Sequence, residues 1–169
     1  MNTILQKELK KILNGRFSQS ESTRLNYSRG EDTYDPILSK AVVFPETNEE
    51  VSKILKLCNE HKVPVVPFGT GTSLEGNVVG NDKGITISLE KMNKILTVNT
   101  QDFDCRVQAC VTREQLNDYL REDGVFFPID PGANAAIGGM ASTSASGTMA
   151  VKYGTMKTVI TGLTVVLPS

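Results

Sequence analysis

The feature that most constrains the fold is a strand, helix and strand in succession between residues 41 and 66. The apolar run AVVF at 41–44 predicts a buried strand, and Thr47 with Glu50 forms a capping-box pattern that opens a helix. The apolar side of this helix is formed by Val51, Ile54, Leu55 and Cys58. The run VPVV at 63–66 predicts the next strand. Two strands joined through a helix call for a parallel pair with a right-handed crossover, so this part of the chain is expected to be α/β.

The flanking segments predict further elements on both sides. Residues 3–15 have the pattern of a short amphipathic helix, and the polar stretch 16–40 predicts a loop region with at most one short helix. Beyond residue 84 we expect a second sheet with mixed or antiparallel pairing, whose strands are ITISL (85–89), KILTVN (94–99) and CRVQACV (105–111). The other predicted elements are a hairpin loop at 99–104, a helix from Thr112 to about Arg121 and a closing strand at 161–168.

Composition excludes several classes of protein. With 169 residues and 39% hydrophobic content, one compact domain is expected, and a net charge of -1 without a basic run argues against a nucleic-acid partner. The three cysteines have neither disulfide nor metal-site spacing, so no metal is expected. No signal peptide or apolar span of ~18 residues is present, which predicts a soluble cytoplasmic protein without a transmembrane segment.

The stretch PVVPFGTGTSLEG (64–76) runs from a strand into a loop of glycines and hydroxyl side chains. Gly69, Gly71 and Gly76 permit positive φ, so backbone N–H groups can converge on phosphate oxygens. The absence of Lys or Arg between residues 63 and 82 excludes a P-loop. A Rossmann loop is disfavoured because no helix-forming segment follows to receive the pyrophosphate. An ordinary tight loop stays an alternative.

A second stretch, PGANAAIGGMASTSASGTMAVKYGT (131–155), is rich in small residues. One side of the chain is left almost free of side-chain bulk at Gly138, Gly139, Ala141, Ala145 and Gly147. Such a run permits close approach by a flat ligand, although a tightly packed helix would use the same residues. Together, the two stretches suit a dinucleotide that lies between two lobes.

These motifs resemble the flavoprotein superfamily of vanillyl-alcohol oxidase and p-cresol methylhydroxylase. The resemblance consists of the loop Pro67 to Ser73, the run Asp130 to Met156 and the segment Gly162 to Pro168, and it covers roughly residues 36–169. It is strongest for the branch with cytochrome-linked D-lactate dehydrogenase, the glycolate oxidase flavin subunit and D-2-hydroxyglutarate dehydrogenase. The fold that it implies is α/β (α+β), with a small parallel lobe at about 36–79 and a mixed or antiparallel lobe at about 80–169, after a helix and loop at 1–35.

The resemblance also implies FAD and the residues that hold it. The pyrophosphate would lie on Pro67, Phe68, Gly69, Thr70, Gly71, Thr72 and Ser73. The flavin and its ribityl chain would lie against Pro131, Gly132, Gly138, Gly139, Ser142, Thr143, Ala145 and Gly147. Some relatives attach FAD covalently through a histidine in the first loop, but Thr72 occupies that position here, which implies non-covalent FAD.

The function implied by the resemblance is oxidation of a 2-hydroxy acid of the D-lactate or glycolate type, with hydride transfer to flavin N5. Neither the base nor the cationic carboxylate anchor of that reaction is assigned to a residue, and the substrate-binding cap is expected to be absent from this chain. The isolated chain is therefore expected to bind flavin weakly or not at all and to lack turnover. The alternatives are a non-catalytic nucleotide- or flavin-binding module and one subunit of a split enzyme, and a homo-oligomer or a partner subunit is possible in either case.

Overall fold

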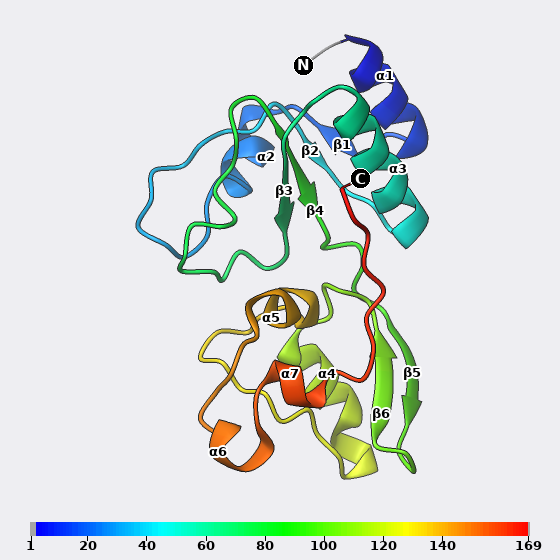
Figure 1. The fold of residues 1–169 in the computed structure, drawn as a ribbon, viewed down its shortest axis with the longest axis vertical. Coiled ribbons are helices and arrows are strands. Elements are labelled where there is room, and N and C mark those ends of the chain that lie inside the picture. Colours follow the sequence, from blue (N-terminus) through cyan, green and yellow to red (C-terminus); the bar gives the residue numbers. More distant parts are fainter. Residues whose placement is uncertain (1–2, 169) are drawn as a thin grey trace. The chain divides into compact units, whose positions relative to one another are not determined.

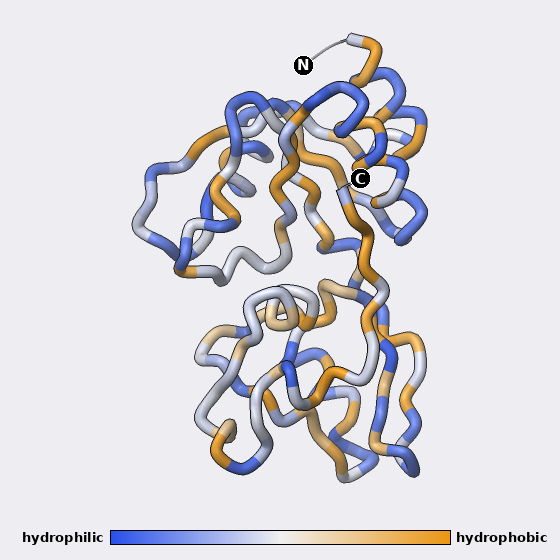
Figure 2. The backbone as a smooth tube through the Cα atoms, in the orientation of Figure 1, coloured by the Kyte–Doolittle hydropathy of each residue, from blue (hydrophilic) through white to orange (hydrophobic). Residues whose placement is uncertain are grey.

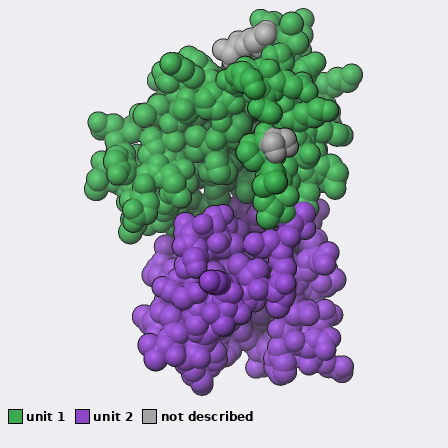
Figure 3. All heavy atoms as spheres, viewed as in Figure 1, with its two compact units in different colours: residues 1–91, 165–169 green, residues 92–164 purple. Residues whose placement is uncertain are grey.

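The computed structural model describes residues 3–168 and divides them into two compact units (Figure 3). The first unit comprises the chain up to Lys91 together with the segment from Val165, and the second comprises Met92–Thr164. The first contains a sheet with parallel strands and the second an antiparallel hairpin, in agreement with the α/β class predicted above.

The sheet of the first unit has the strand order β1-β2-β4-β3 (Figure 1). Its strands are β1 (Phe17–Ser18), β2 (Val42–Val43), β3 (Val65–Phe68) and β4 (Ile85–Ser88). Strand β4 lies between β2 and β3 and is parallel to both, whereas β1 is antiparallel to β2. The predicted direct pairing of the 41–44 and 63–66 strands was therefore wrong, as was the placing of 85–89 in a second sheet. All four residues of β4 are buried. A central position suits such a strand, because it allows backbone hydrogen bonds along both edges and burial of both faces.

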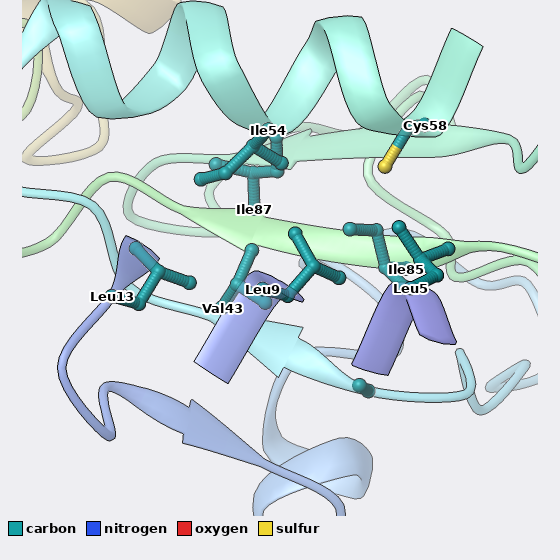
Figure 4. Close-up of a cluster of buried hydrophobic side chains, with 9 residues drawn as sticks. Leu5, Leu9, Leu13, Val43, Ile54, Cys58, Ile85 and Ile87 are labelled. Carbon is teal, nitrogen blue, oxygen red and sulfur yellow. The ribbon is translucent and has the colours of Figure 1, made fainter. Parts of the chain in front are cut away.

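Two helices, α1 (Thr3–Ile12) and α3 (Asn48–Glu60), contribute to one hydrophobic core with the sheet (Figure 4). The helices supply Leu5, Leu9, Ile54 and Cys58, and the strands supply Val43, Ile85 and Ile87. The predicted cap of α3 is confirmed, because the Thr47 hydroxyl accepts a hydrogen bond from the Glu50 N–H at 3.2 Å. The first helix ends three residues before the predicted Gly15, which has a φ of 86°.

The polar region 16–40 contains the short helix α2 (Glu21–Asn26), as predicted, and the two-residue strand β1. Arg16 holds the start of this region against α3. Its guanidinium donates to both Glu50 carboxylate oxygens, at 2.9 and 2.5 Å, and to the Phe44 carbonyl at 2.9 Å. This pairing lowers the pKa of Glu50.

The second unit combines a hairpin with short helices around two apolar clusters. Strands β5 (Ile95–Asn99) and β6 (Asp104–Val107) pair antiparallel, which confirms the predicted hairpin. The helices are α4 (Arg113–Leu120), the 3-10 turn η1 (Arg121–Asp123), α5 (Ile137–Thr143), α6 (Ala150–Tyr153) and α7 (Met156–Val159). The clusters are centred on Val111, Leu116 and Leu120, and on Ile129, Met140 and Met156.

The predicted closing strand at 161–168 is not a strand. A strand is defined by backbone hydrogen bonds to a neighbour, and this segment makes none with any other part of residues 3–168. Among the described helices, none is both long and apolar enough to cross a membrane.

Candidate functional site

The glycine loop, residues 69–76, leaves the end of β3 and folds back over Phe68. Gly71 has a φ of 74°, and a Cβ atom there would lie 2.7 Å from Cζ of the Phe68 ring. Both the backbone conformation and the close approach therefore require glycine at this position. Phe68 is buried while Pro67 and Thr70 are exposed, so the loop rises from the core to the surface of its unit.

Most backbone N–H groups of the glycine loop are not used in hydrogen bonds within the described part of the protein. Within residues 3–168, no backbone N–H from Gly69 to Leu74 donates a hydrogen bond to a protein acceptor. The hydroxyl groups are more engaged: the Thr70 and Thr72 oxygens lie 3.3 Å apart, and Ser73 donates to the amide oxygen of Asn77. A run of six unpaired donors fits the oxygens of a phosphate or pyrophosphate. A contribution of Pro67 to Ser73 to a pyrophosphate site would therefore come from the backbone more than from the side chains.

The glycines of the second stretch fall into two kinds. Gly132 and Gly139 have no atom within 4 Å of the position that a Cβ would take, and both are exposed. Gly138 instead packs against Ala109, whose Cβ and carbonyl oxygen would lie 2.8 and 2.9 Å from an added Cβ. A Cβ at Gly147 would overlap Asp130. Only Gly132 and Gly139 leave bare backbone for a ligand, while Gly138 and Gly147 serve packing within the unit.

The remaining predicted residues of this stretch lie around α5. The Ser142 hydroxyl donates to the Gly138 carbonyl at 2.9 Å, and the Thr143 hydroxyl donates to the Gly139 carbonyl at 3.1 Å. Their hydrogens are therefore used inside the helix, and their oxygens can only accept from a ligand. Pro131 is half-buried, and Ala145 packs against the cluster of Met140 and Met156. Figure 2 draws α5 and the loop after β3 in pale shades, between hydrophobic and hydrophilic.

Asp130 fixes the backbone of the second stretch, a role that the sequence did not reveal. Its carboxylate accepts from the Thr148 hydroxyl and from the Met149 N–H, the latter at 3.0 Å. These hydrogen bonds, the first more than the second, lower the pKa of Asp130 below its ordinary value of 3.8. Because Gly147 also packs on Asp130, this residue holds positions 147–149 against the start of the stretch.

We expect acid to weaken the second unit through Asp130. A carboxyl whose folded-state pKa is lowered stabilises the fold fully above its unfolded value of 3.8, and this stability is lost as the pH falls through the lowered value. Urea unfolding of the protein and of Asp130→Asn, at pH 7 and at several values below 4, measures the effect. The difference between the two proteins should shrink toward low pH. Glu50, whose pKa is also lowered, cancels in this difference, and a difference independent of pH would contradict the prediction.

The other reactive side chains take structural positions. His61 is the C-cap residue of α3. Cys58 and Cys110 are buried, and burial raises the pKa of the Cys58 thiol to about 11. The Tyr153 ring packs edge-on against Phe126 at 5.6 Å, and the Lys152 ammonium lies over the Tyr153 ring. These contacts give each of the groups a packing or capping position.

Comparison with known families decides what the two motifs belong to. Residues 39–169 match the model of a family described as FAD binding domain. The chain belongs to this family. FAD is therefore the cofactor expected from both the motifs and the family, and the geometry of the glycine loop fits it.

Several longer proteins are similar to this chain in sequence. It is 46% identical over 150 residues to the probable mitochondrial D-lactate dehydrogenase of Danio rerio, covering 89% of this chain and 30% of that protein. It is 41% identical to the mitochondrial D-lactate dehydrogenase [cytochrome] of Arabidopsis thaliana, over 96% of this chain and 29% of the relative. A Bacillus subtilis protein named glycolate oxidase subunit GlcD is 33% identical, over 89% and 33% of the two chains.

Solved structures show the same fold. An alkyldihydroxyacetonephosphate synthase matches with a TM-score of 0.91 at 23% identity, over 99% of this chain and 35% of its own. A p-cresol methylhydroxylase with bound substrate matches with a TM-score of 0.62 at 23% identity, over 75% and 25% of the two chains. The resemblance stated from the motifs is confirmed. The chain spans about a third or less of each of these relatives.

Proposed function

We propose that this chain is the FAD-binding portion of a flavin-dependent oxidoreductase that oxidises a 2-hydroxy acid of the D-lactate or glycolate type. The observation that carries the proposal is the run of unpaired backbone donors from Gly69 to Leu74, in a chain 46% identical to a probable D-lactate dehydrogenase. Six donors on a surface loop without a basic side chain suit a pyrophosphate held by backbone alone. The FAD-binding domain over residues 36–169, preceded by a helix and loop at 1–35, is part of this proposal.

The two motifs would bind different parts of FAD. The N–H groups of 69–74 would bind the pyrophosphate, and the bare backbone at Gly132 and Gly139 would accept the flavin and its ribityl chain. Ser142 and Thr143 would accept hydrogen bonds there, since their own hydrogens are donated to carbonyls of α5. When bound, FAD would supply a hydride acceptor.

Attachment of FAD is proposed to be non-covalent. Thr72 stands where some relatives carry a histidine, and the one histidine of the chain, His61, caps α3. A threonine hydroxyl has neither the pKa nor the nucleophilicity to bond a flavin as imidazole does. Acid precipitation should therefore release all bound FAD into the supernatant.

Substrate chemistry is assigned to the rest of the enzyme. Oxidation of a 2-hydroxy acid needs a cationic anchor for the carboxylate and a base for the hydroxyl proton, and we assign neither role to a residue of the two motifs. We therefore expect the 169-residue chain by itself to bind FAD weakly or not at all and to give no D-lactate-dependent dye reduction. A cytoplasmic location and a homo-oligomer or partner subunit stay predictions, and two of the relatives are named as mitochondrial.

A matched pair of variants tests the proposed site. Gly139→Leu places bulk on the exposed face of α5, and Gly162→Leu places the same bulk where nothing lies within 4 Å either. We expect Gly139→Leu to lower FAD affinity at least ~10-fold, which corresponds to about 1.4 kcal/mol, and Gly162→Leu to leave it unchanged. Flavin fluorescence or amide NMR titration measures the affinity, and both methods detect weak binding.

Two results would count against the proposal. Equal FAD affinity of Gly139→Leu and the unaltered protein would remove α5 from the site. Binding of NAD in preference to FAD would overturn the flavin assignment itself. FAD binding by an assembled full-length protein that oxidises no 2-hydroxy acid would instead favour the non-catalytic module.

A further inference from the structure

The segment between α2 and β2 forms a wall along the glycine loop (Figure 1). The closest point is Gly30, where an added Cβ would lie 2.6 Å from the carbonyl oxygen of Ser73 and 2.8 Å from that of Gly71. A third neighbour is a methyl group of Val78, also at 2.8 Å. Gly30 has no positive φ in this structure, so glycine is needed there for space alone.

Further contacts run along the whole length of this segment. The Tyr27 ring packs edge-on against Phe68, with ring centroids 5.1 Å apart. The Ser28 carbonyl accepts from the Gly80 N–H at 2.8 Å, at the far end of the loop region. The Tyr34 ring fills the space beside Gly76, where an added Cβ would lie 2.6 Å away. The segment 27–34 therefore contacts the loop itself at Gly71, Ser73 and Gly76, and it contacts the residues Phe68 and Gly80 on either side of the loop.

Asp32 stabilises the conformation of this segment through hydrogen bonds to its own backbone. Asp32 is only 9% exposed. Its two carboxylate oxygens accept from the Gly30 N–H at 3.1 Å and from the Tyr34 N–H at 3.0 Å. A short carboxylate that caps two amides in its own turn fixes the local backbone. Gly30 is thereby held at a set distance from the loop.

We propose that this wall orients the donors of the glycine loop, with Gly30 as a positioning residue for the FAD pyrophosphate. The N–H and C=O of a trans peptide point in opposite directions. The carbonyls of Gly71 and Ser73 face Gly30, so the following N–H groups, those of Thr72 and Leu74, face away from the wall. These two carbonyl oxygens of the loop thus face the wall, and the N–H groups on the opposite side of the loop are free to bind an anion.

This inference rests on the proposed function and extends it to residues outside the family match. The match begins at residue 39, and the polar stretch 16–40 carries no motif. The positioning role of Gly30 is therefore inferred only from its contacts with the glycine loop. It predicts that the loop sequence 67–76 binds FAD only when the wall is in place.

The test is Gly30→Ala in this chain, with Gly162→Ala as the matched control in open space. Amide NMR spectra without FAD should show displaced resonances for Thr72 and Leu74 in Gly30→Ala, and FAD titration should show affinity lowered at least ~10-fold. The double variant Gly30→Ala with Val78→Ala should not recover affinity, since the carbonyl overlaps persist. Gly162→Ala should match the unaltered protein in both measurements.

A milder variant keeps the inference testable if Gly30→Ala fails to fold. Asp32→Asn removes the carboxylate that accepts from Gly30 and Tyr34 without adding a heavy atom, and we expect it to move the same amide resonances and lower FAD affinity ~3-fold or more. Unchanged loop resonances or unchanged FAD affinity in a folded Gly30→Ala or Asp32→Asn would overturn the inference while leaving the proposed function intact. If the unaltered chain gives no response to FAD at millimolar concentration, the titration is repeated with the same variants in the full-length protein. Failure of the full-length protein to bind FAD would refute the proposed function, and the positioning role with it.

Discussion

Gly147→Ala is expected to destabilise the second unit by about 3 kcal/mol, enough to unfold much of it. A methyl group at this position would overlap the carboxylate and the backbone of Asp130, and backbone cannot move aside as a flexible side-chain end can. The overlap also displaces Thr148 and Met149, so their hydrogen bonds to Asp130 would be lost together. Urea unfolding followed by circular dichroism measures the change.

Gly139→Ala is the matched control within the same stretch. Gly139 is exposed in α5 with nothing within 4 Å of the added methyl, and alanine favours a helix over glycine by about 1 kcal/mol. This variant should be as stable as the unaltered protein or slightly more stable. If Gly147→Ala unfolded at the same urea concentration as Gly139→Ala, the division of these glycines into packing and ligand-facing kinds would be wrong.

Leu9→Ala should destabilise the first unit by about 2–5 kcal/mol. Leu9 lies on α1 and is fully buried in the core that α1 forms with α3 and the sheet. Truncation of its side chain leaves a cavity bordered by Leu5, Ile54 and other members of this core. Chemical unfolding monitored by amide signals of β4 would report the loss in this unit specifically. The second unit has its own clusters, and its transition should not move.

Ile4→Ala is the comparison on the same helix. Ile4 is 60% exposed, so the same loss of aliphatic carbon removes little buried surface and should cost less than about 1 kcal/mol. Equal losses for Leu9→Ala and Ile4→Ala would mean that α1 does not pack on the core as described.

Local chemistry made several elements predictable from the sequence. The Thr47 hydroxyl caps α3 as expected, and the Thr112 hydroxyl caps the helix that was predicted to begin there, since a cap involves neighbours within one turn. The hairpin of β5 and β6 was predictable for the same reason, because its strands are joined by a short turn. Strand β4 was misplaced because its partners β2 and β3 are chosen by burial on both faces, which no local pattern expresses.

The candidate site shows the same division. The order of motifs, Pro67 to Ser73 and then Asp130 to Met156, is written in the sequence, and it alone pointed to a flavoprotein and to the family that the comparison confirmed. The pattern could not separate Gly132 and Gly139 from Gly138 and Gly147. A glycine that faces open space and one that faces Asp130 look alike until the neighbour is known.

The sequence by itself therefore determined the class of fold and the helix caps, because composition and short-range hydrogen bonding need no knowledge of distant contacts. It also pointed to FAD, because the order of its motifs resembles that of a known family. Only the tertiary structure decided that β4 is central, that Asp130 holds the second stretch and that Gly30 lies on the carbonyls of the glycine loop. These features depend on which residues far apart in the chain come within a few ångströms of each other. Close packing then leaves no space for a single methyl group at the points of contact.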